Sequence, residues 1–303
     1  NNSINARIIY SDEAVEKTAD LAIRTMLPSY FFDEVFVSFK TANEIKKKDA
    51  LIVVVDHNKP ELSIYPELYL GGDNKIAIID HHRKTDDAFD SVVFEHIDSS
   101  ASSTCELLSL YFDSYSFKMN ISSEIATLML AGIYLDTTNF KMHTSIGTHE
   151  ASIILSRLGA DEVKARDLLK ESYETFALKS KIISSLEMPE NGVIIVKAPE
   201  EDLVNTTLLS IVCNELRDVQ GTQVCFAIGK TSEDDVNISS RSDGSVNCEL
   251  LMQKLGGGGH FSAAACKLEN VTIEEAENKL KHVLDEYLKD AMSSDRKHED
   301  EGD

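Results

Sequence analysis

The chain has 303 residues, of which 42% are hydrophobic, and it carries a formal net charge of −22. This length predicts about two domains, and the acidity argues against capture of long nucleic acid, which needs basic surface to neutralise phosphates. No stretch approaches the ~20 apolar residues of a membrane helix. The five cysteines lack CxxC spacing, which argues against a thiolate zinc site or a disulfide framework and favours a reducing, cytosolic setting.

Strand-like and helix-like segments alternate through the first half of the chain. We expect strands at 6–10, 34–37, 51–55 and 75–79, and helices at 12–26 and 42–48. Such alternation is typical of βαβ units, in which parallel strands form a sheet with helices on its faces. After residue 80 the pattern becomes mainly helical, with helices expected at 104–111, 122–135, 147–158, 161–171 and 175–186.

A turn cluster, Met188-Pro189-Glu190-Asn191-Gly192, predicts a domain boundary. Beyond it we expect strands at 193–197, 222–228, 235–240 and 263–267, and helices at 205–217, 246–254 and 272–288. Thr272 and Glu275 have the spacing of a capping box. The fold class is therefore α/β: a mainly parallel sheet flanked by helices over 1–174, a connector over 175–191, a smaller α/β domain with a mixed sheet over 192–292, and an acidic disordered tail over 293–303.

Carboxylates and histidines follow the ends of several apolar segments. Asp56 and Asp80 each come directly after a predicted strand, His81 and His82 come next, and Asp136 ends an apolar helical segment. Because the carboxyl ends of strands in an open parallel sheet face one crevice, we expect these side chains to converge. A single Asp after a strand is usually a turn former or helix cap, but this set offers the ligands that divalent cations prefer. The pattern predicts a metal-dependent hydrolase.

The predicted roles follow from the chemistry of paired metal ions. Two divalent ions about 3.5–4 Å apart can activate water and hold both the attacking and the leaving oxygen of a phosphoryl group. We expect Asp56 to bridge the ions, with His81 and Asp136 as further metal ligands. Asp80 would lie behind the histidines and fix an imidazole tautomer. His82 would face the phosphoryl oxygens or complete the network, so Asp80, His81 and His82 are the expected catalytic residues.

The run Gly256-Gly257-Gly258-Gly259-His260 is the second informative motif. Glycines let the backbone approach a ligand closely and leave amide donors unshielded, which suits a phosphate or a nucleotide edge. A helix precedes the run, so the order is not that of a P-loop or a dinucleotide fingerprint, and one glycine can simply end that helix. Arg241, at a predicted strand end, could add a guanidinium for the same phosphate, although a solvated arginine is equally compatible with the pattern.

Four segments together resemble the DHH/DHHA1 phosphoesterase superfamily: Val55-Asp56, Ile79-Asp80-His81-His82-Arg83, Ala131-Gly132-Ile133-Tyr134-Leu135-Asp136-Thr137 and the glycine run. Three more resemble the catalytic portion of GdpP-type cyclic-di-AMP phosphodiesterases: Asp56-His57-Asn58-Lys59-Pro60, Ala101-Ser102-Ser103-Thr104 and the insertion 12–44. The resemblance implies two Mn²⁺ ions, attack of a metal-bound hydroxide on cyclic di-AMP, and release of linear 5′-pApA. It also implies that the glycine run, His260 and Arg241 bind the nucleotide, that the protein is a homodimer, and that this portion is the cytosolic end of a membrane-anchored parent protein.

One family motif is missing from the sequence. The motif is a His-x-x-Pro-Asp-x-Asp loop between a strand and a helix, and it would supply three metal ligands. Residues 1–303 alone are therefore expected to bind at best one ion well and to turn over poorly, as part of a longer catalytic protein. The neighbours of the missing strand would present free hydrogen-bonding edges.

Two other functions stay open at this point. One is the nanoRNase/pAp phosphatase type of the same superfamily, which the insertion 12–44 disfavours. The other is a non-catalytic nucleotide-binding module. An exonuclease that acts on long strands is disfavoured, because the acidic chain offers few basic residues to form a positively charged groove for a polynucleotide.

Overall fold

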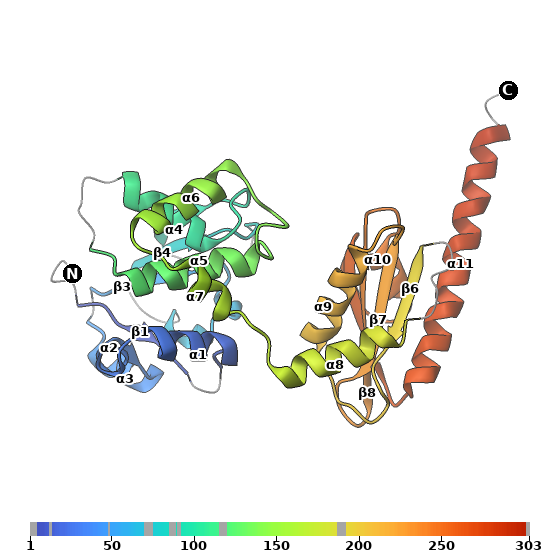
Figure 1. Ribbon diagram of the computed structural model, residues 1–303, viewed down its shortest axis with the longest axis horizontal. Helices are drawn as coiled ribbons and strands as arrows, with labels where there is room; N and C mark the ends of the chain where they lie inside the picture. Colours follow the sequence, from blue (N-terminus) through green and yellow to red (C-terminus); the bar gives the residue numbers. More distant parts are fainter. Residues whose placement is uncertain are drawn as a thin grey trace. The chain divides into compact units, whose positions relative to one another are not determined.

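The structure is a computed structural model that describes residues 5–11, 14–47, 49–69, 75–84, 89, 92–114, 120–186 and 192–300. The chain divides into two compact units, Asn1–Lys170 and Glu171–Asp303. Each unit combines strands and helices (Figure 1). No helix in the described ranges is long and apolar enough to cross a membrane.

The first unit opens with a small parallel sheet and three helices. Strand β1 (Ile8–Ile9) pairs with β2 (Phe36–Val37). The helices are α1 (Lys17–Met26), α2 (Ser29–Val35) and α3 (Phe39–Ile45). The expected strand at 34–37 is right only at its end, because α2, which follows Pro28 at the N-cap, extends through Val35.

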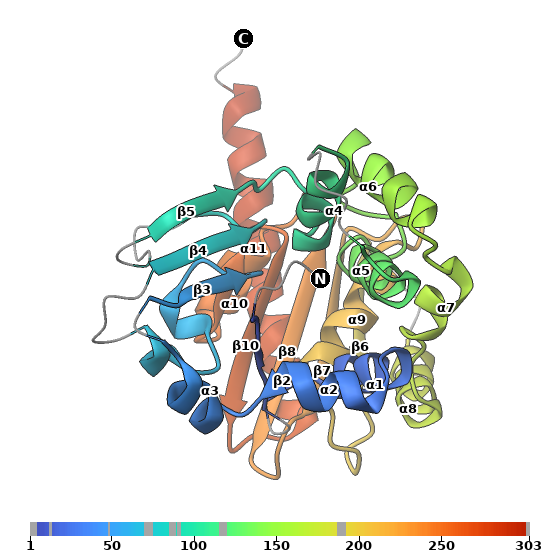
Figure 2. The ribbon, with the colours of Figure 1, turned by 90° about the vertical axis from the view of Figure 1, so that its left-hand side faces the viewer.

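A second sheet in this unit carries most of the predicted metal site. Its parallel strands lie in the order β3 (Leu51–Val55), β4 (Lys75–Asp80) and β5 (Val92–Ile97), and they run side by side in Figure 2. The register pairs Val55 with Ile79, so β3 and β4 end at the same edge. Strand β5 was not predicted. The expectation of mainly helical structure after residue 80 is wrong there, because β5 is completed by pairing with β4.

Strand β3 has an apolar face that the described part of the chain leaves open. No described strand pairs with its outer edge, since β4 is its one neighbour in the sheet order among the described residues. Leu51, Val53 and Val55 are about half exposed, whereas Val54 on the opposite face is buried. An apolar edge strand of this kind is ready to pair with another strand.

Helices complete the first unit. They are α4 (Thr104–Ser114), α5 (Ser123–Asp136), α6 (Ile146–Arg157) and α7 (Glu162–Asp167). Their core is formed by buried side chains such as Leu130, Ile133 and Leu155. The predicted helices agree with these within a few residues, and Asp136 lies at the last turn of a helix.

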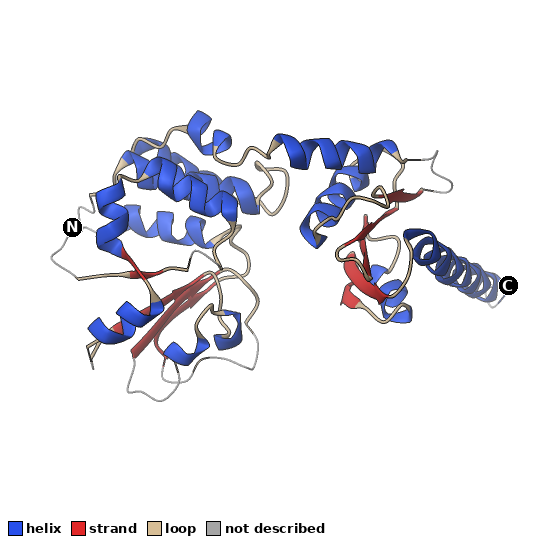
Figure 3. Cartoon of the chain, turned by 90° about the horizontal axis from the view of Figure 1, so that it is seen from below, coloured by secondary structure: helices blue, strands red, loops and turns tan. Residues whose placement is uncertain are grey.

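The second unit is built on a five-stranded mixed sheet in the order β6-β7-β8-β10-β9. The strands are β6 (Val193–Lys197), β7 (Val224–Lys230), β8 (Asp235–Ser242), β9 (Gly258–His260) and β10 (Ala263–Glu269). Among the described strand pairs of this sheet, β6 and β7 are parallel, and the other pairs are antiparallel. The helices are α8 (Tyr173–Ser184), α9 (Thr206–Arg217), α10 (Cys248–Lys254) and α11 (Ile273–Asp300), as Figure 3 displays by element type. The expected α/β class, with a parallel sheet followed by a mixed sheet, is confirmed.

The two faces of this mixed sheet are covered by different helices. Leu209 of α9 packs with Val196 and Cys225 on one face. On the other face, Leu251 of α10 and Leu280 of α11 pack with strand residues of β7 and β8. Ile182 of α8 joins the α9 cluster, so the expected connector helix is part of the second unit's core.

Three further expectations concern the ends of elements in this unit. The capping box of α11 is confirmed: the Thr272 N–H donates to Glu275 Oε2 at 2.9 Å, and the Glu275 N–H donates to Thr272 Oγ1 at 3.1 Å. Helix α11 continues through Asp300, over most of the segment 293–303 expected to be disordered, because an established helix extends readily through charged helix formers. Residues 188–191 of the turn cluster 188–192 lie outside the described residues.

Candidate functional site

Asp56, His81 and His82 meet beyond the carboxyl ends of β3 and β4. One ligand atom from each of the three lies within 4.8 Å of the others, and His81 Nε2 is 3.5 Å from Asp56 Oδ1. The pairing of Val55 with Ile79 places the residues that follow the two strands beside each other. One carboxylate and two imidazoles in this arrangement can hold a divalent cation, such as Mn²⁺ or Zn²⁺.

Asp56 leaves its strand in an unusual backbone conformation. Its φ is +67°, which is uncommon for a non-glycine residue but tolerated by aspartate. The Asp56 N–H still donates to Ile79 O at 3.0 Å. Its carboxylate accepts a hydrogen bond from Thr104 Oγ1 at 2.8 Å. Thr104 was not predicted as a site residue, although its position at the start of a predicted helix in the resembling segment was a usable signal.

Asp80 is fully buried behind the cluster. It accepts hydrogen bonds from His82 Nδ1 at 2.8 Å, from the His82 N–H at 3.2 Å, and from Asn58 Nδ2 at 2.7 Å. Burial by itself would raise the pKa of Asp80, but the His82 and Asn58 hydrogen bonds outweigh it and hold the pKa below its usual value. A carboxylate bonded to Nδ1 leaves the Nε2 atom of His82 free for a ligand.

Asn58 is a residue that the sequence interpretation missed. Its side chain is buried, and it bonds Asp80 as well as the backbone oxygen of Arg83, the latter at 3.3 Å. The two strand-end loops are thereby joined. The available signal was weak: an amide two residues after a strand-end aspartate is usually a turn former.

Asp136 lies near the cluster without joining the three-residue group. It ends α5 and does not follow a strand. Burial and then repulsion from Asp56 raise the pKa of its carboxyl, while His81 and His82 act in the opposite direction. A cation between the two carboxylates would remove this repulsion. The close group consists of Asp56, His81 and His82, and the role of Asp136 as a metal ligand stays a prediction.

The glycine run of the second unit has structural reasons for three of its four glycines. Gly256 has a φ of +83° and follows α10, which fits a helix terminator. A Cβ at Gly257 would lie 2.2 Å from Ala265 O, and one at Gly259 would lie 2.5 Å from Ala264 Cα. A Cβ at Gly258 would meet nothing within 4 Å, as is also true at Gly256, but Gly258 has no positive φ, so it is the one glycine of the run without such a structural reason.

Arg241 and His260 share one face of the mixed sheet. Both are register partners of Ala263, one from β8 and the other from β9, and directly opposed residues of antiparallel strands point to the same side. Gly258 pairs with Ala265, two residues further along β10, and therefore belongs to this face as well. Arg241 Nη1 donates to Ser240 O at 2.8 Å. A guanidinium and an imidazole thus lie on either side of the small residue Ala263 on one face of the sheet.

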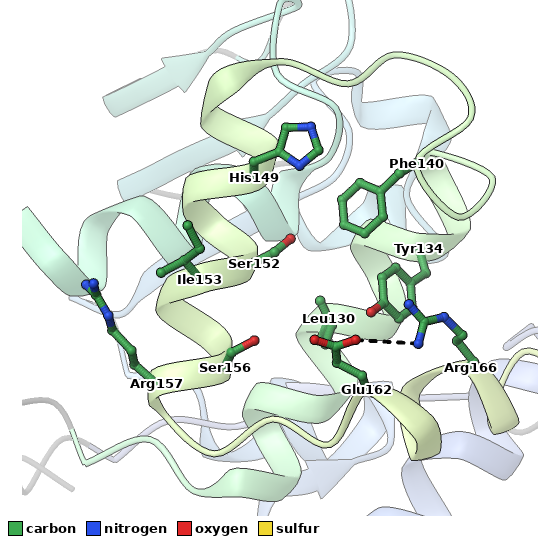
Figure 4. Close-up of a pocket in the computed structure, with 10 residues that line it drawn as sticks. All are labelled: Leu130, Tyr134, Phe140, His149, Ser152, Ile153, Ser156, Arg157, Glu162 and Arg166. Atoms are coloured by element: carbon green, nitrogen blue, oxygen red, sulfur yellow. Dashed lines mark ion pairs between the residues drawn. The ribbon is translucent and has the colours of Figure 1, made fainter.

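A separate hollow of about 540 Å³ lies between α5, α6 and α7 (Figure 4). On one wall, the Arg166 guanidinium lies 4.7 Å from the centre of the Tyr134 ring and 3.5 Å from Glu162. None of the predicted site residues lines it. The hollow is therefore distinct from the strand-end cluster.

Comparison with known sequences identifies both units. Residues 5–133 match the DHH family, N-terminal domain, and residues 190–290 match the DHHA1 domain. A cyclic-di-AMP phosphodiesterase, PdeA, of Listeria monocytogenes is 36% identical over 84% of this chain and 38% of that protein. A cyclic-di-AMP phosphodiesterase, GdpP, of Geobacillus thermodenitrificans is 33% identical over 91% of this chain and 40% of that protein. The chain thus spans about two fifths of the length of these relatives.

A solved structure gives the same result for the fold. An exopolyphosphatase-related protein from Bacteroides fragilis superposes with a TM-score of 0.70 at 18% identity, covering 88% of this chain and 80% of that one. The DHH match lies within the first unit and the DHHA1 match within the second unit. The chain belongs to the DHH/DHHA1 phosphoesterase family.

Proposed function

We propose that the protein hydrolyses cyclic di-AMP to linear 5′-pApA in a reaction that depends on Mn²⁺ or a related divalent cation. The observation that carries this proposal is the meeting of Asp56, His81 and His82 at one point. The substrate is chosen from the relatives, which are cyclic-di-AMP phosphodiesterases.

Asp56 and His81 would hold the cation, with Asp136 and His82 as further ligands or as partners of the phosphoryl oxygens. A divalent cation bound there supplies Lewis-acid stabilisation of phosphoryl charge and lowers the pKa of water. Asp80 orients the His82 ring through Nδ1. The lowered pKa of Asp80 keeps this carboxylate ionised at neutral pH, so its negative charge favours a cation nearby.

The partly exposed sheet face that carries Gly258, His260 and Arg241 would bind the nucleotide. The open space at Gly258 gives access to backbone groups, and Arg241 can pair with a phosphate in two-pronged geometry. These groups recognise a phosphate but do not distinguish one base from another. Homodimer formation and attachment of the whole protein to a membrane stay predictions of the family resemblance.

The test is turnover of three substrates by the full-length protein with Mn²⁺. Cyclic di-AMP, pApA and pAp are incubated separately, and the products are separated by anion-exchange chromatography. We expect cyclic di-AMP to be consumed first and pApA to accumulate. Preferential consumption of pApA or pAp would favour the nanoRNase/pAp phosphatase type, and binding of all three without turnover would favour a non-catalytic nucleotide-binding module.

A further inference from the structure

Glu106, in the first turn of α4, is a buried carboxylate with no role in the site described above. Its side chain is 3% exposed, and a glutamate is almost never buried without a partner. Its Oε2 accepts hydrogen bonds from the Ser102 N–H at 2.9 Å, from Ser102 Oγ at 2.6 Å and from Thr148 Oγ1 at 2.8 Å. Ser145 Oγ lies 3.5 Å from Oε1. These partners come from two separate segments of the chain.

A capping role does not explain this arrangement. Ser103 and Glu106 have capping-box spacing, and the Glu106 N–H donates to Ser103 Oγ at 3.0 Å. In a capping box the glutamate side chain returns to the N–H of the capping residue, as Glu275 does at the start of α11. The Glu106 carboxylate bonds Ser102 and Thr148 instead, and it is buried whereas Glu275 is exposed.

The carboxylate fixes the first turn of α6. A Cβ at Gly147 would lie 2.6 Å from Glu106 Oε1, so the carboxylate packs directly against the second residue of this helix. Thr148, the next residue, donates its hydroxyl to Glu106 and also takes part in the capping box with Ser145. Negative charge is favoured at a helix N-terminus, where N–H groups are unpaired. Glu106 therefore ties the segment at Ser102 to a helix that begins more than forty residues later.

That segment reaches the strand-end cluster through Thr104. Its hydroxyl donates to Asp56 Oδ1, the same oxygen that lies 3.5 Å from His81 Nε2. Asp56 has a positive φ, so its orientation must be maintained by its surroundings. We infer that Glu106 is a positioning residue for Asp56: it anchors the turn at 102–104 to α6, and Thr104 in turn holds the Asp56 carboxylate in the orientation that binds a cation. This inference rests on the proposed function.

The test compares Glu106→Gln with Glu275→Gln in the full-length protein. Both replace a glutamate at the same position of a capping sequence by an amide of similar shape, but only Glu106 is linked to the cluster, through the turn at 102–104. Mn²⁺ binding is measured by isothermal titration, and kcat and KM are measured with cyclic di-AMP. Partners of metal ligands typically contribute about 10-fold to 100-fold to metal affinity or activity, so we expect Glu106→Gln to lose about 10-fold in Mn²⁺ affinity and in kcat, with KM unchanged, and Glu275→Gln to match the wild type.

The link through Thr104 is tested by a double-mutant cycle. Thr104→Val removes the hydroxyl, and its losses should be of similar size to those of Glu106→Gln. If Glu106 acts through Thr104, the double variant should lose little more than the larger single loss. Independent, additive losses would overturn the inference, as would wild-type Mn²⁺ affinity in Glu106→Gln.

Folding and function are separated by further readouts. If circular dichroism finds Glu106→Gln unfolded, Thr148→Val takes its place, because it removes the α6 contact and keeps the carboxylate. It should also weaken Mn²⁺ binding, and wild-type affinity in Thr148→Val would contradict the inference. A wild-type protein that binds Mn²⁺ without hydrolysing cyclic di-AMP would defeat the proposed function, while the Mn²⁺ titrations would still decide the role of Glu106.

Discussion

The strand-end cluster of the first unit and the glycine run of the second unit present polar groups by different means. In the cluster, Asp56, His81 and His82 come from two loops, and partly buried hydrogen bonds from Thr104 to Asp56 and from His82 to Asp80 hold them. In the glycine run, close packing fixes the backbone, and the groups available to a ligand lie on a partly exposed sheet face. Changes at the cluster should therefore affect metal binding and chemistry, whereas changes at the exposed face should affect substrate binding.

The largest expected effect is the loss of His81. Metal chemistry contributes several kcal/mol to transition-state stabilisation, and each 1.36 kcal/mol is tenfold in rate, so we expect His81→Ala to lower kcat by about 10³-fold or more. His282→Ala is the matched control, because this histidine lies exposed on α11. Activity of His81→Ala within tenfold of the wild type would exclude His81 as a metal ligand.

The glycine run offers a paired test with opposite outcomes. At Gly257 a methyl group would collide with Ala265 O, and overpacking costs about 1–3 kcal/mol of the free energy of unfolding. At Gly258 there is room for it, so Gly258→Ala should keep its stability and raise the KM for cyclic di-AMP. Urea unfolding and steady-state kinetics on both variants measure the two effects. A destabilised Gly258→Ala, or one with unchanged KM, would remove Gly258 from the proposed ligand face.

The smallest expected effect is a pH dependence of stability at Asp80. The folded-state pKa of Asp80 is lowered from 3.8, so its contribution to stability is present above the unfolded-state pKa and is lost as the pH falls through the folded-state pKa. Asp80→Asn should therefore be less stable than the wild type at pH 7, by about 1–3 kcal/mol for a disrupted buried hydrogen-bonded group. Urea unfolding from pH 7 down to acid should find this difference shrinking. If the difference in free energy of unfolding between the two proteins grew on acidification, the folded-state pKa of Asp80 would not be lowered, and this account of Asp80 would be wrong.

The sequence predicted the parts of the fold that local patterns determine. The strands at 51–55 and 193–197 agree with β3 and β6 at both ends, because apolar β-branched runs are bounded there by polar or turn residues. Strand β5 was missed, since half of its residues remain exposed and its signal is weak. Strand β9 was missed because glycines have no strand preference, and its pairing depends on β10.

The candidate site was predictable only in its most characteristic residues. Asp56, Asp80 and the two histidines could be found from their places after strands, and the structure brings Asp56, His81 and His82 together. The supporting residues Asn58, Thr104 and Glu106 could not be found in this way. Their roles depend on partners that are 22, 48 and 42 residues away in the chain, and no local pattern encodes such a pairing.

The most direct test of the central claim is anomalous diffraction at the manganese absorption edge, from crystals of the full-length protein grown with Mn²⁺. We predict a peak beside Asp56 and His81, with the Asp56 carboxylate and His81 Nε2 within about 2.5 Å of the ion. Occupied Mn²⁺ sites elsewhere on this acidic protein, with none between Asp56 and His81, would contradict the account.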